Sequence, residues 1–175
     1  YSGMKNDLIS YHFLEKHFAD STENVTNVLP AYVDGDGNCL FHSISLQLSG
    51  KQDLSMELRL NSLIGAINDF ERISQRGRSE GFTFYSFSDE DIVKSQSNAF
   101  KELNTLAISG THAGPIASLG LSFDSNIAVD FHYPPENGPF DMAGTLFSGL
   151  FTSKAQGQEV DQEIVTKVRI FIYLT

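Results

Sequence analysis

The sequence reads Asp-Gly-Asp-Gly-Asn-Cys-Leu-Phe at residues 34–41, and this stretch is the most informative part of the chain. Its first five residues are common turn formers. Apolar residues then recur every four positions, which is the spacing of one helix face. We therefore predict a turn over 34–38 and a helix over 39–49, with Gly50 as its C-terminal cap. Cys39, the only cysteine of the chain, would lie where the turn meets the helix.

Alternating oxygen-bearing side chains in this stretch raise the question of a calcium site. Asp34, Asp36 and Asn38 have the spacing of the first ligands of an EF-hand loop. Such a loop requires Gly at its sixth position and Glu at its twelfth. Those positions hold Cys39 and Ser45, so the sequence does not favour calcium binding.

Two interpretations of Cys39 remain open from the residues alone. One is a turn followed by an unreactive, buried thiol. The other is a catalytic nucleophile, because the N–H groups at a helix N-terminus favour the thiolate form of a cysteine. The backbone N–H groups from Gly37 through Cys39 could also bind the oxyanion that forms at a scissile carbonyl.

A family resemblance favours the nucleophile. Residues 36–44, Asp-Gly-Asn-Cys-Leu-Phe-His-Ser-Ile, resemble the signature around the nucleophile of the ovarian tumour (OTU) cysteine proteases. In that family, Asp-Gly-Asn-Cys is followed by an apolar residue, an aromatic residue and the start of a helix. Weaker similarities lie downstream, at Leu58-Arg59, at 111–116 in place of the family's Trp-Gly-Gly segment, and in two strands at 127–129 and 170–172.

The resemblance implies an α+β, papain-like OTU fold, with a small central β-sheet flanked by helices in one domain over 1–175. It implies a deubiquitinase that hydrolyses (iso)peptide bonds at the C-terminus of ubiquitin or polyubiquitin through a Cys39 acyl-enzyme. Gly37 and Asn38 would supply backbone donors for the oxyanion. Neither a metal nor an organic cofactor is implied.

The catalytic base is not where the family places it. In OTU proteases a histidine followed by an aromatic residue comes after the last core strand, and this sequence ends at Thr175, directly after the last predicted strand. His-aromatic pairs occur instead at His12, His17 and His132. If the N-terminal segment joined the sheet beside the last strand, a circularly permuted OTU fold would bring His12 or His17 to the thiol.

Among these candidates we select His12 as the base, because Ile9, Tyr11 and Phe13 alternate around it as in a strand over 9–14. His17 is the alternative base, and a helix over 7–19 is the competing structure. Asp36 is the candidate that would either orient the imidazole or shape the oxyanion turn, with Asp34 and Asp20 as weaker choices. His42 and His112 are left out of the site.

Two other functions stay open. The absence of a histidine after the last strand is compatible with an inactive OTU-like module that only binds ubiquitin. A viral-type OTU protease that also processes a polyprotein or removes ubiquitin-like modifiers is the second alternative.

The composition of the chain narrows the range of possible functions further. The formal net charge of −10 and the pI of about 4.8 argue against a nucleic-acid binder. No apolar run is long enough to span a membrane, and no signal peptide is recognisable at the N-terminus. A single cysteine allows no intramolecular disulfide. We expect a monomer in a reducing compartment, the cytoplasm, or the host cytosol if the protein is a secreted effector.

The rest of the chain predicts further helices and strands. A helix follows Ser55 as its N-cap, and another begins at Ser88. A short helix is expected over 115–122, and strands over 127–131 and 164–174. The helix after Ser55 is predicted to bury an apolar stripe made of Leu60, Leu63, Ile64, Ile67 and Phe70.

Overall fold

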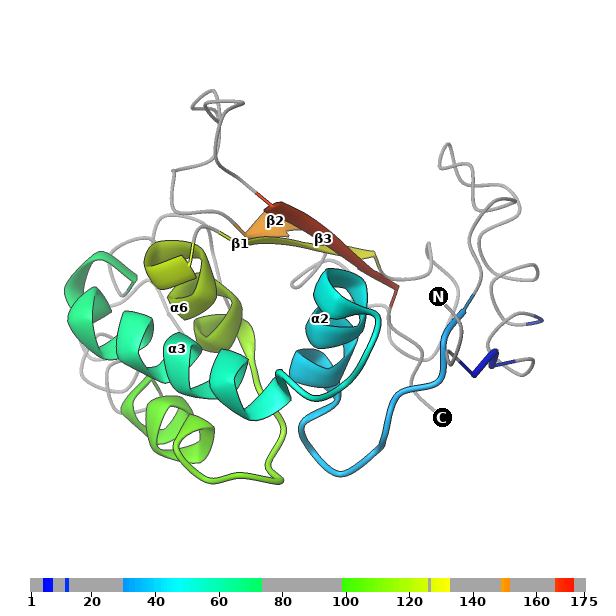
Figure 1. Cartoon of the computed structure of the whole chain (residues 1–175). Coiled ribbons are helices and arrows are strands. Elements are labelled where there is room, and N and C mark those ends of the chain that lie inside the picture. The colour runs from blue at the N-terminus through cyan, green and yellow to red at the C-terminus, as the bar shows by residue number, and fades with distance from the viewer. Residues whose placement is uncertain are drawn as a thin grey trace.

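The computed structural model describes residues 5–7, 12, 30–73, 99–125, 127–132, 149–151 and 166–171 (Figure 1). The labelled elements are the helices α2, α3 and α6 and the strands β1, β2 and β3. Residues 99–106 are also helical. The predicted helix that begins at Ser88 lies outside the described residues up to residue 98.

Helix α2, Cys39–Ser49, has the predicted bounds. Gly50 ends it in the left-handed conformation at φ 77°, and its N–H donates to the carbonyl of Leu46. Only glycine adopts this conformation without steric cost, so the predicted cap is confirmed. The following loop is held by Ser45, whose hydroxyl donates to the Lys51 carbonyl and accepts from the Leu54 N–H.

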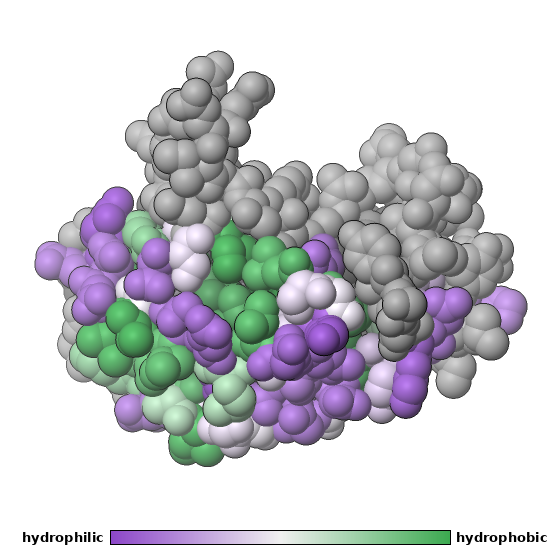
Figure 2. All heavy atoms as spheres, in the orientation of Figure 1, coloured by the Kyte–Doolittle hydropathy of each residue, from purple (hydrophilic) through white to green (hydrophobic). Residues whose placement is uncertain are grey.

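Helix α3, Ser55–Asn68, begins one residue earlier than the N-cap assignment of Ser55, since Leu54 takes the cap position. The predicted buried stripe of α3 is wrong for three of its five residues, whereas Leu63 and Phe70 are partly buried against the core. Leu60 is 55% exposed, Ile64 41% and Ile67 55%, whereas the buried positions include Ser62, Gly65 and Ala66. Figure 2 shows hydrophobic side chains on the molecular surface over this helix.

The reason is the close crossing of α3 with α6, Pro115–Ser125. A Cβ atom on Gly65 would overlap the carbonyl oxygen of Gly120, and one on Gly120 would overlap the carbonyl oxygen of Ser62. The Ser62 hydroxyl donates to the carbonyl of Ala117 at 2.7 Å across this crossing. Backbones this close require small residues, so the small face of α3 turns inward, and Leu60, Ile64 and Ile67 turn outward.

The described sheet has three strands in the order β2-β1-β3. β1, Ile127–His132, runs parallel to β3, Thr166–Phe171, and antiparallel to β2, Gly149–Phe151. The predicted strands are therefore confirmed for β1 and for the central part of 164–174, whereas β2 has no counterpart among the predictions. α2 contacts β3, and α6 contacts β1 (Figure 1).

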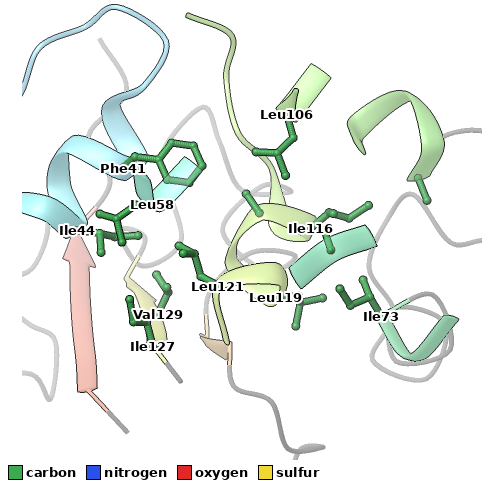
Figure 3. Packing of buried hydrophobic residues seen from close by; sticks show 13 residues of the cluster. Phe41, Ile44, Leu58, Ile73, Leu106, Ile116, Leu119, Leu121, Ile127 and Val129 are labelled. Atoms are coloured by element: carbon green, nitrogen blue, oxygen red, sulfur yellow. The ribbon is translucent and has the colours of Figure 1, made fainter. Parts of the chain in front are cut away.

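The hydrophobic core joins the helices to β1 (Figure 3). Phe41 and Ile44 reach it from α2, and Leu58 from α3. Each of these side chains lies on the inner face of its helix, and Phe41 and Ile44 have no solvent exposure. The other large members come from α6, β1 and the neighbouring helical segments, namely Ile73, Leu106, Ile116, Leu119, Leu121, Ile127 and Val129. The packing of Phe41 and Ile44 thus fixes the start of α2, where Cys39 lies.

The N-terminal segment differs from the prediction. His12, the one residue of 9–14 that the structure describes, is helical and exposed, so the predicted strand is wrong at this residue. Asn6 forms an antiparallel bridge with Ala31, which places residues 5–7 beside the segment that leads to the turn before α2.

These elements amount to a mostly helical α+β arrangement with a small sheet. The circular permutation is not shown by the described elements. In the part of the chain that the structure covers, no helix is both long and apolar enough to cross a membrane.

Candidate active site

Cys39 is the first residue of α2 and is partly exposed. It follows the turn Asp36-Gly37-Asn38, and residues 36–39 are called the nucleophile turn below. Because Cys39 begins the helix, its N–H group has no acceptor within α2. The thiol and this amide therefore lie side by side at a helix N-terminus.

Gly37 allows a second turn to approach the nucleophile turn closely. Its φ is 86°, and a Cβ atom there would overlap the carbonyl oxygen of Gly110. Gly110 itself has φ 78°. Two glycines thus meet backbone to backbone, which places the turn over 108–111 directly against the nucleophile turn.

Asp36 organises the nucleophile turn through both of its carboxylate oxygens. Oδ1 accepts the backbone N–H of Asn38 at 2.9 Å, and Oδ2 accepts the Asn38 side-chain amide at 3.2 Å. Nε2 of His42 lies 3.1 Å from Oδ1. These contacts, led by the backbone hydrogen bond, lower the pKa of Asp36 to about 2. One of the two predicted oxyanion donors, the Asn38 amide, is consequently occupied.

Asn38 occupies the N-cap position of α2 but does not cap the helix with its side chain. Asparagine at this position ordinarily accepts an N–H of the first turn. Here its side chain is 95% buried and turned elsewhere. Its Oδ1 accepts from Nη1 of Arg59 at 2.9 Å and from the Gly110 N–H at 3.4 Å. The first-turn amides of α2 are therefore left without this common partner.

Arg59 is the hub that holds both turns. It is 97% buried and lies over the ring of Phe41, with 5.3 Å between Cζ and the ring centroid. Besides Asn38, its described acceptors are the carbonyls of Thr105, Leu106, Ile108 and Thr111 and the hydroxyl of Thr111. Burial lowers the pKa of the guanidinium, and the charge of Asp36 opposes that effect.

In the sequence, Arg59 counted only as part of the Leu58-Arg59 pair that resembles the OTU family, and no role was predicted for it. The signal in the sequence was a cation between two leucines on an apolar helix. If such an arginine is buried, it requires several hydrogen-bond acceptors. The carbonyls that surround it lie at the end of the helical segment 99–106 and just beyond it, where the negative end of a helix dipole favours a cation.

The described histidines lie in different parts of the structure. His42, which the sequence analysis set aside, is buried and contacts Asp36, while its Nδ1 has no hydrogen-bond partner among the described residues. His12 is exposed, and His112 is exposed beside Thr111. His132 ends β1. The alternative base His17 lies outside the described residues, so the choice of base stays a prediction.

The described residues contain no group of three or more histidine, cysteine or acidic side chains arranged to hold a metal ion.

Glu102 is a further acidic residue of interest, outside the nucleophile turn. The carboxylate of Glu102 accepts the N–H of Ile116 at 2.8 Å, in the first turn of α6. Burial raises the pKa of Glu102 to about 7.

A comparison with protein-family models agrees with the motif. The family model described as "Vertnin, OTU domain" matches residues 30–71, which contain the nucleophile turn, α2 and α3. The resemblance to the OTU family is confirmed over this segment. Among solved structures, the chain is similar to the viral OTU domain protease from Farallon virus, with 16% identity over 79% of this chain and 76% of that chain, at a TM-score of 0.43. A comparison with curated protein sequences gave no match.

Proposed function

We propose that this chain, whose residues 30–71 match an OTU domain, is a cysteine-dependent deubiquitinase. The observation that supports this most strongly is the position of Cys39. A partly exposed thiol begins α2, and the one side chain that would ordinarily cap the helix is bound elsewhere. Acyl transfer needs such a combination of a nucleophile and adjacent, available N–H donors.

In the proposed reaction, a histidine takes the proton of the Cys39 thiol, the thiolate attacks the carbonyl carbon of the C-terminal glycine of ubiquitin, and a C–S bond forms. The negative charge that develops on the carbonyl oxygen is stabilised by the Cys39 amide and its neighbours at the helix N-terminus. Cleavage of the C–N bond releases the amine, which takes a proton from a histidine, and leaves a thioester. Water then hydrolyses the thioester and regenerates the thiol.

Asp36 has a positioning role in this proposal. Both of its oxygens bind Asn38, and His42 contacts one of them, so the carboxylate shapes the turn that carries the thiol. Shaping the turn is one of the two roles expected for Asp36, and the other, orienting a catalytic imidazole, stays a prediction. The acidic surface of the chain, with a net charge of −10, is compatible with the arginines of the ubiquitin tail.

His12 is the proposed base, and His17 is the alternative. The assignment is tested by comparing His12→Ala, His17→Ala and His132→Ala on one fluorogenic ubiquitin substrate. A base variant should lose activity on the scale of Cys39→Ala, while His132→Ala should not. If His132 alone proves essential, the proposal for the N-terminal histidines is wrong.

The function itself is tested with a ubiquitin probe that carries a C-terminal electrophile. Wild type should form a covalent adduct and hydrolyse the fluorogenic substrate, and Cys39→Ala should do neither while keeping its circular dichroism spectrum. Full hydrolysis by Cys39→Ala would refute the enzyme assignment. Binding of ubiquitin without any adduct in wild type would favour the inactive binding module, and a panel of modifier probes would separate ubiquitin from ubiquitin-like substrates.

A further inference from the structure

The side-chain oxygen of Asn38 can accept from two alternative sets of donors, while its amide donates to Asp36, and only one of these sets leaves the first-turn amides of α2 open for an oxyanion. As the N-cap residue of α2, it could accept the N–H of Leu40 or Phe41, the second and third residues of the helix. In the structure it instead accepts from Arg59 and from Gly110. The stronger of these contacts, by distance, is the charge-assisted one from Arg59 at 2.9 Å.

Arg59 is well suited to hold an asparagine in this position. Its other described hydrogen bonds end on carbonyls and on the Thr111 hydroxyl, at distances from 2.6 to 3.1 Å. These contacts fix the guanidinium independently of Asn38. Nη1 therefore presents a donor at a set place, and the asparagine turns toward it.

We propose that Arg59 is a positioning residue that draws the Asn38 side chain away from the N-terminus of α2 and so keeps the first-turn amides available for the oxyanion. Without Arg59, the Asn38 carboxamide would rotate toward its ordinary capping position and compete with the substrate oxygen. The effect on turnover rests on the proposed function, whereas the effect on Asn38 itself does not.

The kinetic test compares Arg59→Met with Ser62→Ala. Ser62 is buried one turn further along α3, and its variant loses the hydrogen bond to Ala117 without touching Asn38. We expect Arg59→Met to lower kcat about 10-fold or more with little change in KM, because oxyanion contacts are made in the transition state. Ser62→Ala should keep the wild-type kcat.

A second-site variant distinguishes competition from simple loss of structure. If a capping Asn38 blocks the amides in Arg59→Met, then adding Asn38→Ala removes the competitor and should raise kcat above that of Arg59→Met alone. If Arg59 only stabilises the fold, the double variant should be less active than either single variant, and the proposal is overturned.

Amide hydrogen exchange tests the same idea without any ubiquitin substrate. The N–H groups of Leu40 and Phe41 should exchange more slowly in Arg59→Met than in wild type, because one of them gains the Asn38 acceptor. General destabilisation would speed exchange instead. If Arg59→Met does not fold, Arg59→Lys is the substitute, since it keeps the charge but lacks the planar fork.

The outcomes separate the two proposals. Slower exchange at Leu40 or Phe41 in the Arg59 variant supports the positioning role even if wild type shows no hydrolysis, in which case the proposed function alone fails. Unchanged or faster exchange at both amides overturns the positioning role even if Cys39 proves catalytic.

Discussion

Replacing Gly37 with alanine tests the contact between the nucleophile turn and the 108–111 turn. The residue has φ 86°, and a left-handed conformation costs a non-glycine residue about 1–2 kcal/mol. The added methyl would also overlap the carbonyl oxygen of Gly110, so one of the two turns must move. Such overpacking costs a further 1–3 kcal/mol, roughly. We expect Gly37→Ala to lower the free energy of unfolding by about 2–5 kcal/mol.

The matched control lies two residues earlier. A Cβ atom on Gly35 would have no neighbour within 4 Å, and its φ lies outside the left-handed region. Gly35→Ala should therefore change the free energy of unfolding by less than about 1 kcal/mol, in the stabilising direction. Gly110→Ala is intermediate, because its φ is 78° but its nearest neighbour, the Asp36 carbonyl oxygen, would be 3.3 Å away.

The assay is urea unfolding followed by circular dichroism, because the chain has no tryptophan to report by fluorescence. Alkylation of Cys39 by iodoacetamide, measured in parallel under native conditions, reports on the nucleophile turn itself. Displacement of the turn should change the alkylation rate in Gly37→Ala and not in Gly35→Ala. Equal stabilities and equal alkylation rates for these two variants would refute the described packing.

Three further predictions concern other parts of the molecule. Glu102 has a pKa of about 7 in the folded protein against an ordinary 4.5, so the folded state holds the proton more tightly and loses stability as pH rises from 4.5 to 7. That loss amounts to about 3 kcal/mol in the free energy of unfolding. Glu102→Gln should abolish it in unfolding curves recorded at pH 4.5 and pH 8. Identical pH profiles for wild type and Glu102→Gln would contradict the role of burial. Leu58→Ala should lower the free energy of unfolding by about 2–4 kcal/mol because Leu58 is 6% exposed. Leu60→Ala should lower it by under about 1 kcal/mol because Leu60 is 55% exposed. The reverse order in urea unfolding would restore the stripe predicted from the sequence. Asp36→Ala should lower kcat on a ubiquitin substrate through loss of its three contacts to Asn38 and His42, while Asp34→Ala, whose backbone N–H still donates to Gln52, should lower it less; equal wild-type rates would remove Asp36 from the site.

The local features of the site were determined by the sequence itself. Turn formers followed by a four-residue apolar spacing predicted α2 with its bounds and its Gly50 cap, because these are effects within a few residues of one another. The motif at residues 36–44 likewise predicted the family resemblance that the match at 30–71 confirms. The position of Cys39 at the helix N-terminus follows from the same short stretch.

Contacts between distant segments were decided only by the tertiary structure. Leu60, Ile64 and Ile67 of α3 were assigned to the core because bulky side chains usually are, yet the crossing at Gly65 and Gly120 turns the small face inward. The apolar pattern of one helix does not predict where the backbone of another helix will cross it.

The same holds for the partners of the nucleophile turn. Arg59 lies 21 residues from Asn38 and 52 from Thr111, and no spacing in the sequence predicts that one guanidinium joins them. An asparagine before a helix predicts a side-chain cap, whereas in the tertiary structure the buried Arg59 and the Gly110 N–H bind the side-chain oxygen of Asn38 instead.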